Sequence, residues 1–91
     1  SKTHFRDYYE PMADRILGFY ELATTLTAAY LSHGVENGYL HADLDIDNTA
    51  RAINGMIVGS VIAGIQNPDL NQPQLAEAMR RVMYDGISRT S

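Results

Sequence analysis

Cysteine is absent from the 91 residues of this chain. Disulfide bonds and metal sites built on thiolates are therefore excluded, which fits a protein of a reducing compartment such as the cytoplasm. A chain this short buries only a modest share of its surface, so small domains are often supported by disulfides, metals or a second copy of themselves. With disulfides excluded, we expect association with a second copy.

Positive charge is scarce, because 7 Lys and Arg residues stand against 11 Asp and Glu residues and the formal net charge is −4. An acidic chain repels the phosphate backbone of nucleic acids, so we do not expect this chain to bind DNA by itself. The first residue is Ser1 rather than Met. We therefore expect the chain to be a piece of a longer protein.

Long hydrophobic runs are also missing. The most apolar stretch covers residues 52–65 and is interrupted by Asn54 and Ser60, whereas a membrane-spanning helix needs about 20 apolar residues. Residues 1–10 are polar and aromatic and do not have the composition of a secretory signal peptide. We expect a cytoplasmic protein with no membrane partner.

Apolar residues recur at steps of three and four, which indicates helices rather than strands. In the first segment, over residues 5–38, Pro11 should either open the helix at its first turn or kink it, and we expect a short lead-in before Pro11 and a long helix after it. Gly38 should form a left-handed cap at the end of this helix. The apolar face of this segment comprises Phe5, Tyr8, Met12, Ile16, Phe19, Ala23, Leu26 and Tyr30.

Two further helices follow. Asp45 should cap the second, which carries Asp47 in its first turn and ends near Asn67, before Pro68. The third should begin at Asn71, with Gln74 three residues later as in a capping box. Short connections between three helices predict an all-α antiparallel helical bundle, formed by one long helix and a two-helix hairpin within a single domain over residues 1–91.

The D-x-D-x-D pattern of Asp43, Asp45 and Asp47 is similar to the start of a calcium-binding loop. The pattern then fails, because Asn48 stands where the loop needs its turn glycine and Asn54 stands where it needs a bidentate glutamate. We interpret these carboxylates as part of a helix-capping loop.

No catalytic or metal-binding residues are predicted. His4, His33 and His41 lack the spacing of a metal site, and no cysteine joins them. The sequence also has no nucleophile elbow, no phosphate-binding glycine loop and no carboxylate pair with a partner base. We expect neither enzymatic activity nor a cofactor.

Aromatic residues concentrate on the first helix, among them Tyr8, Tyr9, Phe19 and Tyr20. The ordinary interpretation is a packed core, and the functional alternative is the lining of a small-molecule cavity between helices. Under this alternative, an effector of unknown identity would contact Met12, Ile16, Phe19 and Tyr20, with Met56 opposite.

Small residues recur along the second helix at Ala52, Gly55, Gly59 and Ala63. A glycine inside a helix costs about 1 kcal/mol relative to alanine, so two glycines suggest that another backbone comes close. The neighbour is either the first helix of the same chain or a second copy across a two-fold axis. For a homodimer, the predicted interface residues are Gly55, Gly59, Ala63, Met79, Val82 and Met83.

The stretch GVENGYLHADLD over residues 34–45 resembles the TetR/AcrR family of transcriptional regulators. In that family a long helix ends in G-x-x-x-G, and an aspartate matching Asp45 caps a helix with an interior glycine matching Gly59. The closing helix over residues 73–88 is also similar, and the resemblance covers the chain from about Ile16 onward. The family usually has proline where this chain has Ile46.

The resemblance implies that the last two helices pair with their copies in a four-helix bundle, and that the long helix takes part in a ligand pocket. Contact with DNA would come only through an N-terminal helix-turn-helix domain that is missing from this chain. We therefore expect an effector-sensing and homodimerisation module of a bacterial TetR-family transcriptional repressor. The alternative is a purely structural dimerisation module without a ligand.

Overall fold

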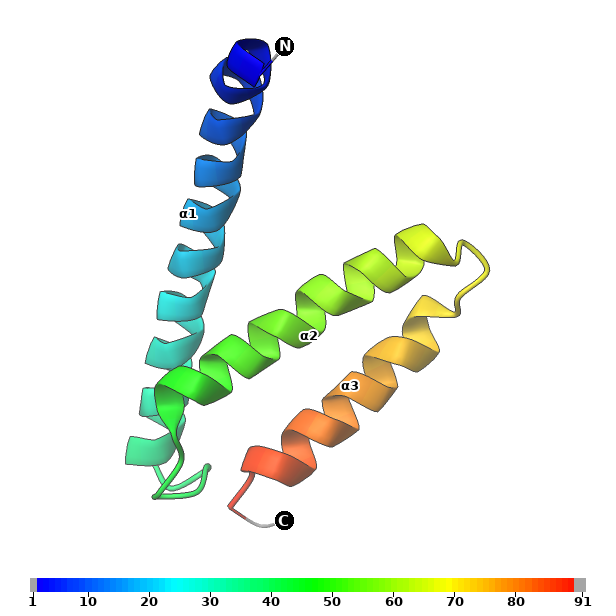
Figure 1. Cartoon of the computed structure of the whole chain (residues 1–91). Coiled ribbons are helices and arrows are strands. Elements are labelled where there is room, and N and C mark those ends of the chain that lie inside the picture. Colours follow the sequence, from blue (N-terminus) through cyan, green and yellow to red (C-terminus); the bar gives the residue numbers. More distant parts are fainter. Residues whose placement is uncertain (1, 90–91) are drawn as a thin grey trace.

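The computed structural model describes the backbone of residues 2–89 and the side chains of residues 10–89. Within this part of the chain three α-helices form, α1 (Lys2–Glu36), α2 (Ile46–Gln66) and α3 (Gln72–Ile87), and no extended strand is present (Figure 1). The prediction of an all-α protein is confirmed. The side chains of His4, Phe5, Tyr8 and Tyr9, which entered the sequence predictions, lie outside the described residues.

Helix α1 is continuous through Pro11, so the predicted separate lead-in is wrong. Proline fixes φ near the helical value, so a long helix can continue through it. The cost is about 3 kcal/mol, because proline lacks the backbone N–H donor and crowds the preceding turn. The end of α1 follows the prediction, because Gly38 has a φ of 77°. Beyond it, the N–H groups of Tyr39 and Leu40 both donate to the carbonyl of Gly34, at 2.9 and 3.2 Å.

Both predicted caps of the hairpin helices are confirmed. Asp45 Oδ1 accepts from the backbone N–H of Asn48 at 3.2 Å, and its Oδ2 accepts from Asn48 Nδ2 at 2.9 Å. Both hydrogen bonds lower the pKa of the Asp45 carboxyl, and the one from the Asn48 side chain has the larger effect. At the start of α3, Asn71 Oδ1 accepts from the N–H of Gln74 at 3.1 Å.

The helices lie in a single layer. α2 and α3 form an antiparallel hairpin, and α1 crosses the first half of α2 and then diverges from it (Figure 1). The principal dimensions are 55 × 32 × 13 Å, and the smallest is close to the diameter of one helix, about 10–12 Å. The Cα radius of gyration is 16.7 Å, against about 12 Å for a compact domain of this length.

One layer of helices cannot enclose a core. Among the described residues only Leu31, Ala50, Asn54 and Ser88 are buried, and no large side chain is completely buried. The chain exposes 7169 Å², whereas a compact monomer of this mass would expose about 5,300 Å². The excess of about 1,900 Å² indicates that this arrangement needs further cover.

Gly38 provides a test of the left-handed cap. Replacing Gly38 with Ala should lower the free energy of unfolding by about 1–2 kcal/mol, because an L-residue is strained in the left-handed region. In addition, the new Cβ would lie 3.1 Å from Arg89 Nη1. The control is Gly18→Ala, where a Cβ has no neighbouring atom within 4 Å, and helix propensity should raise stability by about 0.5–1 kcal/mol. Urea unfolding followed by circular dichroism separates the two, and equal stability of both variants would contradict the cap.

Candidate functional site

A polar clamp, formed by Asn54 of α2 with Thr24 and Thr27 of α1, joins the first two helices where they cross. Asn54 Nδ2 donates to Thr24 Oγ1 at 3.0 Å, and Thr27 Oγ1 donates to Asn54 Oδ1 at 3.3 Å. Only 6% of Asn54 is exposed, and Ala50, one turn earlier, is fully buried. The small Ala50 side chain allows close approach, and the clamp satisfies the carboxamide that this approach buries.

Beside the clamp, α1 and α2 enclose an open hollow of about 320 Å³, which we call the α1–α2 hollow. This volume lies at the lower end of the range for small-molecule sites, about 300–1,000 Å³. Its mouth is wide, because Phe19 is 72% exposed and Ile16 is 62% exposed. The lining residues are Ile16, Phe19, Tyr20 and Ala23 from α1 and Asn54, Ile57 and Val58 from α2.

Three of the five predicted ligand-binding residues, Ile16, Phe19 and Tyr20, come together in this hollow. Met12 lies one turn before Ile16 on α1 and is 51% exposed, and it does not line the hollow. Met56 is half-buried and is also absent from the lining. A residue two positions after Asn54 is turned by about 200° around the helix, so it points away from α1.

Sequence reasoning did not identify four lining residues, Ala23, Asn54, Ile57 and Val58. The last three share a helix face by their i, i+3 and i+4 spacing. Asn54 itself could have indicated this site, because a buried carboxamide within an apolar run is expected to be hydrogen-bonded to another side chain.

Tyr20 separates the α1–α2 hollow from a polar neighbour. Its hydroxyl lies 3.4 Å from the carbonyl oxygen of Arg51, to which it donates. On the other side of Tyr20 is a second hollow of about 350 Å³, lined also by Glu21, Thr24, Thr25 and Arg51. The charged side chains near the crossing therefore belong to the second hollow.

Apart from the two hollows, α2 has an open side that carries Gly55 and Gly59. A Cβ built on either glycine has no neighbouring atom within 4 Å from elsewhere in the part of the chain that the structure describes. Packing against α1 within one chain therefore does not account for these glycines. Ile62, on the same side by its i+3 spacing from Gly59, is 50% exposed.

The other predicted dimer residues lie in or beside the hairpin. Met79 and Met83 are half-buried and line a shallow hollow of about 260 Å³ with Ser60 of α2. Ala63 is also half-buried, whereas Val82 is 64% exposed. Gly55, Gly59 and Val82 are thus the predicted contacts that the single chain leaves most open.

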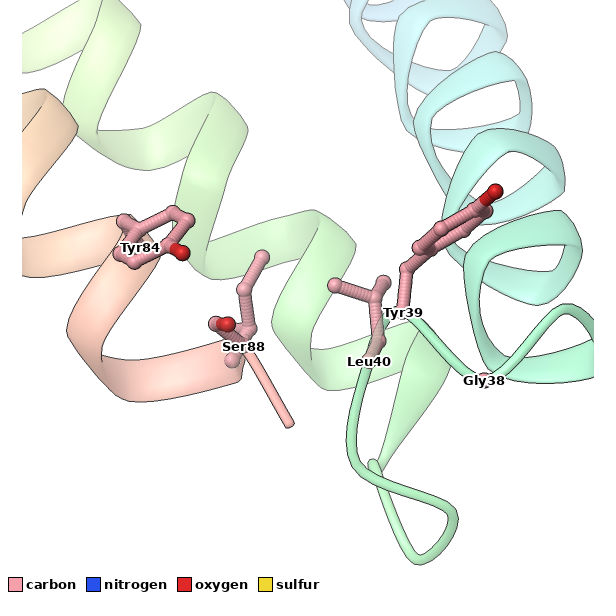
Figure 2. Close-up of a pocket in the computed structure, with 6 residues that line it drawn as sticks. Gly38, Tyr39, Leu40, Tyr84 and Ser88 are labelled. Carbon is pink, nitrogen blue, oxygen red and sulfur yellow. The ribbon is translucent and has the colours of Figure 1, made fainter. Parts of the chain in front are cut away.

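A fourth hollow, also of about 320 Å³, lies where the α1–α2 linker meets the end of α3 (Figure 2). Leu40 and Ser88 form an isolated antiparallel bridge, with His41 N donating to Ile87 O at 3.2 Å and Arg89 N donating to Tyr39 O at 3.1 Å. This bridge fastens the hairpin to the linker. The sequence did not predict this bridge, because its two sides are far apart in the chain.

A charged cluster of Glu77, Arg80 and Arg81 lies on the exposed surface of α3. Arg80 Nη2 lies 2.7 Å from Glu77 Oε1, and Arg81 Nε lies 3.3 Å from the same oxygen. Hydrogen bonds from Arg80 and then Arg81 lower the pKa of Glu77 to about 2. The side chains are at least half exposed, and exposed ion pairs of this kind contribute little to stability.

Among the described residues, no three His, Cys, Asp or Glu side chains are grouped so that they could hold a metal ion. Within the same residues, no helix combines the length and apolar character needed to cross a membrane.

Comparisons with known proteins give no relative for this chain. No protein-family model matches it, and no curated protein or solved structure is significantly similar to it.

The polar clamp can be tested with two neighbouring threonines. Thr24 and Thr25 each donate to a carbonyl one turn earlier, Tyr20 O and Glu21 O, but only Thr24 also accepts from Asn54. Thr24→Val should lower the free energy of unfolding by about 1–3 kcal/mol, because it leaves a buried donor unpaired. Thr25→Val should change it by no more than about 0.5 kcal/mol.

The measurement is urea unfolding of both variants, repeated in an Asn54→Leu background. The effect of Thr24→Val should largely disappear in that background, because the donor is no longer there. Equal effects of the two threonine variants would show that the clamp does not hold the crossing.

Proposed function

We propose that this chain is a cytoplasmic regulatory module that forms a homodimer and senses a small-molecule effector, as in TetR-type transcriptional repressors. The observation that carries the proposal is the open side of α2, where a Cβ added to Gly55 or Gly59 would meet no other part of the described chain within 4 Å. The order of helix end, capping Asp45 and interior Gly59 supports the regulator type by resemblance.

The exposed area supports a second copy. A standard interface buries about 800 Å² on each partner, and the chain exposes about 1,900 Å² more than a compact monomer would. In a two-fold arrangement the same patch covers itself, so one surface on α2 and α3 is enough. The glycines permit close approach of the two backbones, which offsets their cost of about 1 kcal/mol each within a helix.

The sensing part of the proposal depends on α2. This helix provides Asn54, Ile57 and Val58 to the α1–α2 hollow and Gly55 and Gly59 to its open side. A ligand that changes how α2 sits against α1 therefore acts on the helix that also meets the partner. Binding and dimer geometry are then linked reciprocally. Contact with DNA belongs to a separate helix-turn-helix domain, in agreement with the net charge of −4.

The alternative function is a structural dimerisation module without a ligand. The wide mouth of the α1–α2 hollow favours it, because Phe19 and Ile16 are mostly exposed, and known small-molecule sites bury most of their ligand. The two functions share the dimer and differ only in whether the hollow binds a small molecule.

Gly59→Leu tests the dimer, with Gly18→Leu as its control. Both are helical glycines with open space around an added Cβ, so the single chain should tolerate either leucine. Only Gly59→Leu should weaken the dimer, by about tenfold or more, because packed interfaces accept little added volume.

Light scattering after size exclusion, at tens of micromolar protein, gives the mass of each form. We expect dimers for the wild type and for Gly18→Leu, and a shift to monomer for Gly59→Leu. A monomeric wild type would contradict the dimer, whereas a fully dimeric Gly59→Leu would contradict only the assignment of Gly59 to the interface.

A further inference from the structure

We propose that the α1–α2 hollow selects an uncharged, largely apolar ligand that carries one hydrogen-bonding group. The inference rests on the proposed function, because it specifies the chemical class of the effector. It derives from the residues that line the hollow and from those that are kept out of it.

The lining contains no carboxylate, amine or guanidinium. Five of its seven residues are purely aliphatic or aromatic, Tyr20 adds a hydroxyl that donates to the carbonyl of Arg51, and the remaining residue is Asn54. Glu21 and Arg51 lie behind Tyr20, in the neighbouring polar hollow. A charged group on the side that contacts this lining would therefore gain no counter-ion, whereas an uncharged group needs none. Apolar contact with Phe19, Ile57 and Val58 supplies the favourable free energy of binding.

Asn54 supplies the polar group of the site. A carboxamide offers two N–H donors and an oxygen with two lone pairs. Within the described residues, the clamp uses one donor toward Thr24 and one acceptor position toward Thr27. A second donor and a second lone pair remain on a side chain that is 94% buried, since 6% is exposed, and that lines the hollow. A hydroxyl, carbonyl or amide of the ligand matches this capacity.

The clamp also makes this polar group rigid. Thr24 is itself tied to the carbonyl of Tyr20 at 2.9 Å, so the orientation of Asn54 is set from α1 as well as from α2. A polar group held in place before binding favours one ligand orientation without a further entropic cost.

Two dyes with the same aromatic frame test the charge preference. N-phenyl-1-naphthylamine is uncharged and has one N–H group, and 8-anilino-1-naphthalenesulfonate adds a sulfonate to that frame. Fluorescence titration of the full chain should show saturable binding of one neutral dye per chain. The sulfonate should bind at least about tenfold more weakly, because no cation meets it in the hollow.

Two alanine variants locate the binding. Ala23 lines the α1–α2 hollow, whereas Ala29 lies on another exposed patch of α1 with Leu26, Tyr30 and His33. Ala23→Trp should fill the hollow and reduce binding of the neutral dye by tenfold or more, and Ala29→Trp should leave it unchanged. Circular dichroism of both variants checks that the helices persist.

The outcomes separate the two proposals. If the sulfonate binds as tightly as the neutral dye and Ala23→Trp abolishes both, the hollow is a ligand site but the charge preference is wrong. If neither dye binds while light scattering still shows a dimer, the sensing function fails and the structural alternative holds. Neutral dye binding that is insensitive to Ala23→Trp would overturn the site itself.

Discussion

The buried carboxamide of Asn54, hydrogen-bonded to Thr24 and Thr27, is the constraint on which the arrangement of this chain depends. It fixes where α1 crosses α2, and the helices diverge from that point (Figure 1). Apolar residues beyond the crossing have no partner across the gap, as the 58% exposure of Val61 and the 76% exposure of Ile65 show. The hollow therefore lies beside the clamp, and the exposed apolar residues lie beyond it.

Helix α2 links the two proposed activities because it has three distinct sides. One carries Ala50 and Asn54 against α1, one faces α3 through Ser60, and one presents Gly55 and Gly59 to open space. A single layer about one helix thick leaves such a third side unavoidable. If a second copy covers it, any movement of α2 at the hollow reaches the partner directly, because the same rigid helix forms both contacts.

The features that the sequence predicted correctly are local. The caps at Gly38, Asp45 and Asn71 depend on residues within one helical turn, so spacing and residue type were sufficient. Pro11 misled the prediction because proline is a frequent helix boundary, whereas here the helix continues through it.

The features that the sequence did not predict depend on angles between helices. Periodicity shows that Met56 and Ile57 lie in an apolar helix, but only the crossing with α1 places Ile57 and Val58 at the hollow. In the same way, the pattern of Gly55 and Gly59 left two neighbours possible, and the geometry removed the one within the chain. The bridge between Leu40 and Ser88 joins distant segments by backbone bonds, to which side-chain patterns are insensitive.

The central claim is that a second copy completes this fold, and thermal unfolding at different protein concentrations tests it most directly. Association of native chains stabilises them by mass action, so the Tm of a dimer depends on concentration. We predict that Tm rises by several degrees between about 1 and about 100 µM protein, with unfolding and dissociation in one transition. A Tm that stays the same over this range would show that the single layer of helices is stable alone, and would contradict the account.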